Sequence, residues 1–113
     1  MVSKNIDGAS IRGAISDFRV RIQEFEKASG SIALWKSDQH YRDLWDNLII
    51  SVKFLENVVS KNADGELTKK YASVVLSELE RLVDYSHNSG ESGADEILAG
   101  MQRDAVPIGK LTW

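Results

Sequence analysis

Three long segments of this 113-residue chain carry apolar side chains at spacings of three and four residues. At about 100° per residue, this spacing places the apolar side chains on one face of an α-helix, so each segment predicts an amphipathic helix. We expect these helices over residues 11–28, from a cap at residue 37 or 38 to residue 61, and over residues 66–88. Their apolar faces consist of Ile11, Ile15, Phe18, Ile22 and Phe25; Tyr41, Trp45, Leu48, Val52, Leu55 and Val59; and Tyr71, Val75, Leu79 and Leu82.

The breaks between these segments are short and contain turn-forming residues. Ser10 is suited to cap the first helix, and Gly30 follows its end. Residues 29–37 are expected to form a loop, residues 61–65 a tight turn, and residues 1–9 a flexible lead. Short connections favour antiparallel neighbours, so we predict an all-α, single-domain chain folded as an antiparallel helical bundle.

A stretch rich in glycine and serine separates the third helix from a shorter fourth one. Ser92 with Asp95 three residues later approximates a capping box, which predicts a helix over residues 93–103. Pro107 is expected to end regular structure, leaving residues 105–113 as an apolar C-terminal tail that folds back onto the bundle. The buried residues expected in the fourth helix are Ile97, Leu98 and Met101, and those in the tail are Ile108, Leu111 and Trp113.

The second long helix is apolar on two sides. Ile50, Phe54 and Val58 lie roughly 100–180° from Tyr41 around the helix axis. Such a helix is either central in its own bundle or covered by another copy of the chain. A homodimer therefore remains open beside the monomer, because an isologous contact is the commonest way to bury one patch twice.

Composition excludes several functional classes. The chain has no cysteine, which rules out disulfides, Cys-ligated metals and thiol catalysis. Its apolar runs are too short to span a bilayer, and its first residues lack an apolar signal segment, so we expect a cytoplasmic protein. The net charge of −3 disfavours nucleic acid and anionic membranes as partners. No phosphate-binding glycine loop or other cofactor motif is found, and no cofactor is expected.

Two histidines are the candidates for metal chemistry. Register arithmetic about the 61–65 turn places His40 and His87 at the same end of the bundle, near Asp43 and Asp84. Two imidazoles and two carboxylates would form a site for zinc or another divalent ion. The alternative is that both histidines are exposed helix-end residues, since a histidine at a helix C-terminus is favoured by the helix dipole.

Arg81 and His87 also form an Arg-x5-His motif. The motif resembles that of the HEPN ribonucleases, which are small helical bundles, and the resemblance implies that the two side chains act on a scissile phosphate. Leu82 stands where that family has a polar residue. On an ideal helix the two side chains point about 120° apart, so they converge only if the helix ends before His87.

Residues 78–104 form an acidic block with seven carboxylates and only two arginines. Complementary potential steers association and selects partners, so the block predicts a docking surface for a basic protein. The alternative is a solvated surface that serves solubility. The binding candidates are Glu78, Asp84, Glu91, Asp95 and Glu96, with Tyr85 as the apolar anchor.

The segment His87-Asn88-Ser89-Gly90, followed by Asp95-Glu96-Ile97, is similar to the recognition loop of the colicin-nuclease immunity family. Leu98-Ala99-Gly100 replaces the tyrosine pair and the proline of that family. The resemblance implies an inhibitor, immunity or antitoxin-like protein that binds a nuclease toxin. We therefore expect binding instead of catalysis, with a small ribonuclease and a homo-oligomeric helical scaffold as alternatives.

Overall fold

The computed structural model of the chain describes residues 8–61, 65–91 and 93–109. All regular secondary structure in these residues is helical, which confirms the predicted all-α class. None of the helices in this part of the chain is long and apolar enough to cross a membrane. The elements are α1 (Gly8–Ala28), the 3-10 helix η1 (Ser29–Ser31), α2 (Ala33–Ser37), α3 (Gln39–Ser60), α4 (Gly65–Asn88), α5 (Asp95–Asp104) and α6 (Val106–Gly109).

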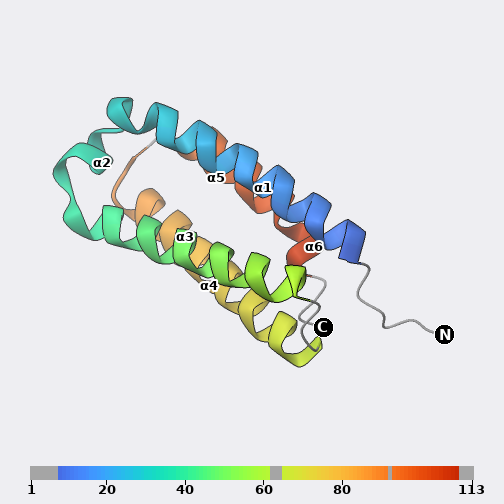
Figure 1. Ribbon diagram of the computed structural model, residues 1–113. Helices are drawn as coiled ribbons and strands as arrows, with labels where there is room; N and C mark the ends of the chain where they lie inside the picture. The colour runs from blue at the N-terminus through green and yellow to red at the C-terminus, as the bar shows by residue number, and fades with distance from the viewer. Residues whose placement is uncertain (1–7, 62–64, 92, 110–113) are drawn as a thin grey trace.

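The long helices α3 and α4 pack closely as a hairpin, and α1, α5 and α6 cover one side of it (Figure 1). Successive long helices run in opposite directions, and α5 lies alongside α1. The short helix α6 contacts both α1 and α4. This arrangement confirms the predicted antiparallel bundle, and it gives α4 one flank that faces α5 and α6.

The core is built from the predicted apolar faces. Among the predicted long-helix positions whose side chains are described, only Tyr71 is partly exposed. Phe25 stacks on Trp45 with ring centroids 4.0 Å apart. Phe25 and Trp35 lie in a T-shaped arrangement with ring centroids 5.6 Å apart. Each aromatic pair of this kind adds about 0.5–1.5 kcal/mol to the effect of burial alone. The side chain of Ile11 lies outside the described residues.

The segment expected to be a loop, residues 29–37, contains two short helices instead. Ile32 is buried and Trp35 is half-buried, so the segment is held against the core on its apolar side. The predicted cap of α3 is confirmed at Asp38, whose carboxylate accepts hydrogen bonds from the backbone N–H groups of His40 and Tyr41. A side-chain cap satisfies backbone donors that have no partner inside the helix.

Two helix starts differ from the predictions. α1 begins at Gly8, so Ser10 lies inside the helix instead of at the predicted N-cap position. α5 begins at Asp95 with Ala94 at the N-cap position, two residues later than expected. Ser92, the first residue of the predicted capping box, lies outside the described residues. The same holds for residues 1–7, which make up most of the predicted lead.

The prediction that Pro107 ends regular structure was wrong. Pro107 lies in α6, where the first turn of a helix tolerates proline because its missing N–H has no partner there in any case. Ile108 is buried, so this part of the tail packs on the bundle as expected. Leu111 and Trp113 lie outside the described residues.

Candidate functional site

Glu91 was predicted to contact a partner, but its carboxylate is engaged inside the molecule. One oxygen accepts a hydrogen bond from the backbone N–H of Leu34 at 2.8 Å, and the other from that of Gly93 at 2.8 Å. Leu34 lies in the first turn of α2, whose N-cap residue Ile32 offers no side-chain oxygen. Glu91 therefore caps α2 from a distant part of the chain and is half-buried there.

Tyr85, predicted as the apolar anchor for a partner, also makes contacts inside the molecule. Its hydroxyl donates to Asp38, and its ring stacks on Tyr41 with centroids 6.2 Å apart. The His40 ring meets the Tyr85 ring edge-on at 4.8 Å. The predicted apolar anchor is therefore part of the contact between the start of α3 and the end of α4.

The two histidines lie at neighbouring helix ends, His40 at the start of α3 and His87 in the last turn of α4. A hydrogen bond from the Tyr41 hydroxyl to Ser86 Oγ, 3.2 Å long, joins these ends. Even so, in the described part of the chain no three His, Asp or Glu side chains are grouped closely enough to hold a metal ion. The predicted four-ligand site with Asp43 and Asp84 does not form.

The Arg81 and His87 side chains are not brought together either. α4 continues to Asn88, so the six-residue spacing directs the two side chains about 120° apart around the helix. Arg81 is exposed and instead lies 3.5 Å from Glu78 of the same helix, whose side chain is largely buried. The geometry that the ribonuclease alternative needs is absent from α4.

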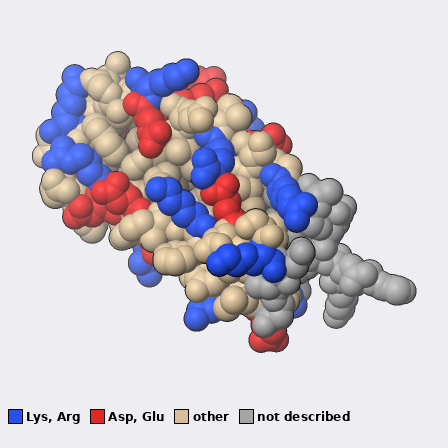
Figure 2. Space-filling view, viewed as in Figure 1, with Lys and Arg blue, Asp and Glu red and all other residues tan. Residues whose placement is uncertain are grey.

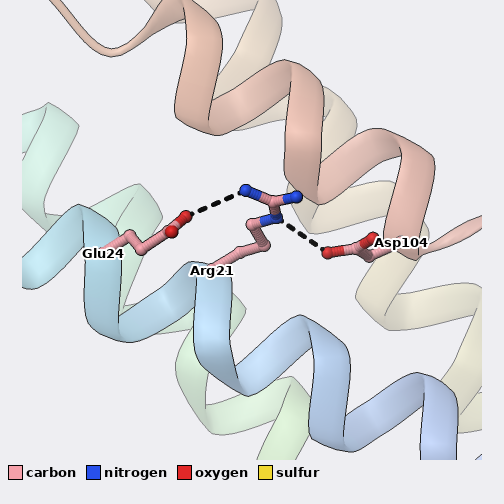
Figure 3. A network of polar contacts seen from close by, with 3 residues as sticks. All are labelled: Arg21, Glu24 and Asp104. Atoms are coloured by element: carbon pink, nitrogen blue, oxygen red, sulfur yellow. Dashed lines mark hydrogen bonds and ion pairs between the residues drawn. The ribbon is translucent and has the colours of Figure 1, made fainter.

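Asp104, the last carboxylate of the acidic block, pairs with Arg21 of α1. Arg21 Nε donates to Asp104 at 2.9 Å, and its Nη1 donates to Glu24 at 3.0 Å (Figure 3). The Arg21 stem crosses α5 at Gly100, where an added Cβ would lie 3.0 Å from the guanidinium carbon. Glycine at this position therefore allows the arginine to bridge α1 and α5.

The carboxylates that remain available are Glu80, Asp84, Asp95 and Glu96, all exposed. Glu80 and Asp84 lie one helical turn apart and make no ion pair or hydrogen bond with another described residue. They border a hollow between α4 and the α5–α6 segment, which we call the acidic groove. It is lined by Leu76, Leu79, Glu80, Asp84, Gln102, Ala105, Val106 and Gly109.

The floor of the acidic groove is apolar, and Val106 is 56% exposed there. On the face seen in Figure 2, by contrast, basic and acidic side chains are interspersed without a patch of one sign. Glu80 is one of the seven carboxylates of the acidic block, but neither Glu80 nor Val106 was among the predicted binding residues. The spacing of four between Glu80 and Asp84 was the available signal.

The second apolar face of α3 is only partly covered. Val58 is buried at 9% exposure, so it belongs to the interior, whereas Ile50 and Phe54 are 50% and 51% exposed. The alternative in which α3 is central in its own bundle therefore does not hold for these two residues. Phe54 stacks on Tyr71 of α4 with centroids 5.6 Å apart. We call Ile50, Phe54, Tyr71 and Val74 the apolar strip.

Comparisons with models of protein families, with curated proteins and with solved structures found no match to this chain. The resemblances to HEPN ribonucleases and to colicin-nuclease immunity proteins therefore depend only on the short motifs in which they were noticed. The features that bear on function are therefore the two exposed surfaces, the acidic groove and the apolar strip.

Proposed function

We propose that this protein acts by binding a basic protein partner in the acidic groove. The observation that carries the proposal is the pair Glu80 and Asp84, two carboxylates one turn apart on α4 that no other described residue pairs with, above an apolar floor. A lysine or arginine side chain of a partner can approach both carboxylates at once. Its aliphatic stem, or an apolar neighbour, would then cover Val106.

The two parts of the acidic groove contribute differently to binding. Exposed ion pairs are worth only about 0.2–1 kcal/mol each, so Glu80 and Asp84 mainly steer the partner and select its charge. Burial of apolar surface around Val106 and Leu76 supplies affinity, at about 25 cal/mol per Å² removed from water. Asp95 and Glu96 lie in the first turn of α5, where negative charges interact favourably with the helix dipole. They are secondary candidates for binding the partner.

We further propose that the partner is an enzyme, such as a nuclease toxin, which this chain inhibits as an immunity or antitoxin-like protein. The support is the acidic block in a small helical chain and the similarity of residues 87–97 to an immunity-protein recognition loop. Enzymes that bind nucleic acid carry basic surfaces, and an acidic protein of this size is suited to cover one.

The test compares two variants with the same change in net charge. The groove variant combines Glu80→Lys with Asp84→Lys. The control combines Asp17→Lys on α1 with Asp46→Lys on α3, where both carboxylates are exposed and make no ion pair or hydrogen bond with other described residues. Neither variant removes a contact of the fold, so circular dichroism should match that of the unaltered protein.

The three proteins are immobilised and exposed to a lysate of the source cells, and retained proteins are identified by mass spectrometry. We expect basic proteins to be retained by the wild type and the control but lost from the groove variant. Association with such a partner should slow steeply with salt while dissociation changes less, because the Debye length is ~8 Å at physiological salt. Equal retention by all three proteins would contradict the proposal. An inhibitor should also abolish the partner's enzymatic activity.

A further inference from the structure

The apolar strip lies on a part of the α3–α4 hairpin that α1, α5 and α6 leave open. Ile50, Phe54 and Val74 are 50%, 51% and 37% exposed, and the stacked pair Phe54–Tyr71 joins the two helices into one surface. A contiguous apolar surface contributed by two helices marks an interaction site more often than isolated exposed residues do. The strip shares no residue with the acidic groove.

Glu78 adds an unsatisfied acceptor beside the strip, in the hollow that it shares with Asn47 and Ser51. Its Oε1 lies 3.5 Å from Arg81. Its Oε2 is buried and accepts no hydrogen bond from any described residue. A buried carboxylate oxygen without a donor is costly, so a cation brought by a partner would stabilise the complex.

Charges of opposite sign flank the strip along its length. Because α3 and α4 are antiparallel, Asp43 and Glu78 lie toward the end where α3 begins, and so does Arg81, which lies 3.5 Å from Glu78. The two carboxylates outnumber this arginine, and we call this end the acidic end. Lys61 and Lys70 lie toward the turn between the helices, which we call the basic end. Lys70 Nζ is 5.9 Å from the centroid of the Tyr71 ring, so this ammonium group lies beside the strip itself.

We propose that a second copy of this chain covers the apolar strip, antiparallel to the first and related to it by a twofold axis. A twofold rotation places the basic end of each copy over the acidic end of the other, so both sets of opposite charges meet at once. A lysine of the partner subunit then supplies a donor to Glu78, whose carboxylate rotates so that each oxygen has one cation. The same contact removes the apolar strip of each copy from water.

The central experiment reverses the charges at one end of the strip at a time. The basic-end variant combines Lys61→Glu with Lys70→Glu, and the acidic-end variant combines Asp43→Lys with Glu78→Lys. Either change places like charges together in a homodimer. We expect the dimer dissociation constant, measured by sedimentation equilibrium, to rise by more than about tenfold in each. An equimolar mixture of the two variants should form a heterodimer, because opposite charges meet again.

If the two variants had lost dimerisation because they misfold, mixing them could not restore a dimer. Formation of the heterodimer therefore tests the charge contacts independently of stability. A matched apolar pair adds a second measurement: Val74→Asp lies in the strip, and Val20→Asp lies on α1, where Val20 is 53% exposed. We expect the first to be monomeric and the second to remain dimeric. A monomeric wild type, a dimer that survives Val74→Asp, or a mixture that stays monomeric would each overturn the proposal, and none of them bears on the acidic groove.

Discussion

The hydroxyl of Tyr85 donates a hydrogen bond to Asp38, 47 residues earlier in the chain. The other oxygen of Asp38 accepts from the backbone N–H groups of His40 and Tyr41 and so caps α3. One carboxylate thus joins the start of α3 to the last turns of α4. The Tyr85 hydrogen bond is the main cause of the lowered pKa of Asp38, and it raises the pKa of Tyr85.

Tyr85→Phe is expected to lower the melting temperature and to flatten its dependence on pH. The folded pKa of Asp38 lies below its unfolded value of about 3.9, so its contribution is present above that pH and is lost as pH falls through the folded pKa. The folded pKa of Tyr85 is raised, so its contribution is present below pH ~10 and is lost as pH rises through the raised value.

Thermal unfolding followed by circular dichroism across both pH ranges measures these effects. Tyr71→Phe serves as the control, because the Tyr71 hydroxyl makes no hydrogen bond with another described residue. We expect the control to keep both the acid and the alkaline dependence of the wild type. If Tyr85→Phe keeps them too, the bond to Asp38 does not contribute to stability.

Glu91→Gln is expected to act on stability, although the sequence placed Glu91 in a binding surface. The change weakens the acceptor for the backbone N–H groups of Leu34 and Gly93. Loss of a helix cap costs about 0.5–2 kcal/mol, which urea denaturation resolves. Glu96→Gln, at an exposed position without such bonds, is expected to stay within about 0.5 kcal/mol of the wild type. Equal stabilities of the two variants would contradict the capping role.

Gly100→Ala is expected to have an effect that depends on Arg21. Alanine is favoured over glycine in a helix by about 1 kcal/mol, but the added Cβ at 3.0 Å would displace the arginine that binds Asp104. We expect Gly100→Ala to stabilise the protein by about 1 kcal/mol when Arg21→Ala is already present, and by less when it is not. A double-mutant cycle in urea measures the difference. Additive effects would show that Gly100 and Arg21 are independent.

His87→Ala is expected to leave the free energy of unfolding within about 0.5 kcal/mol of the wild type, since this side chain is exposed, whereas Arg81→Ala is expected to lower stability by more because it removes the cation that lies 3.5 Å from Glu78. We also expect the wild type not to cleave RNA, because α4 keeps the two side chains apart. Incubation of the purified protein with several RNAs and divalent ions tests this. Cleavage that is lost in both variants would revive the ribonuclease alternative.

The buried faces of the long helices were predictable from spacing alone. Phe18, Leu48 and Leu82 are all fully buried, as their positions in the four-and-three pattern predict. The direction of a helical side chain depends on the local backbone, so residues three and four apart share a face wherever the helix packs. The Asp38 cap was predictable for the same reason, because the backbone N–H groups of His40 and Tyr41, which donate to one of its oxygens, lie within three residues of it.

Short segments and the use of individual polar groups were not predictable in this way. α2 has only five residues, and its helical state depends on the burial of Ile32 and on the distant carboxylate of Glu91. Spacing likewise grouped Val58 with Ile50 and Phe54, although only Val58 is buried. Which acids remain available was not predictable either, since Glu91 and Asp104 have partners elsewhere in the fold while Glu80 has none among the described residues.

The sequence by itself therefore determined the helix class, the long helices and the faces they bury, because these follow from contacts a few residues apart. Only the tertiary structure decided which charged and apolar side chains remain for a partner. Asp38 and Tyr85 are 47 residues apart, Leu34 and Glu91 are 57 apart, and Arg21 and Asp104 are 83 apart. No local pattern encodes a contact over such separations, because it depends on how whole helices pack and on which side chains then come within hydrogen-bonding distance.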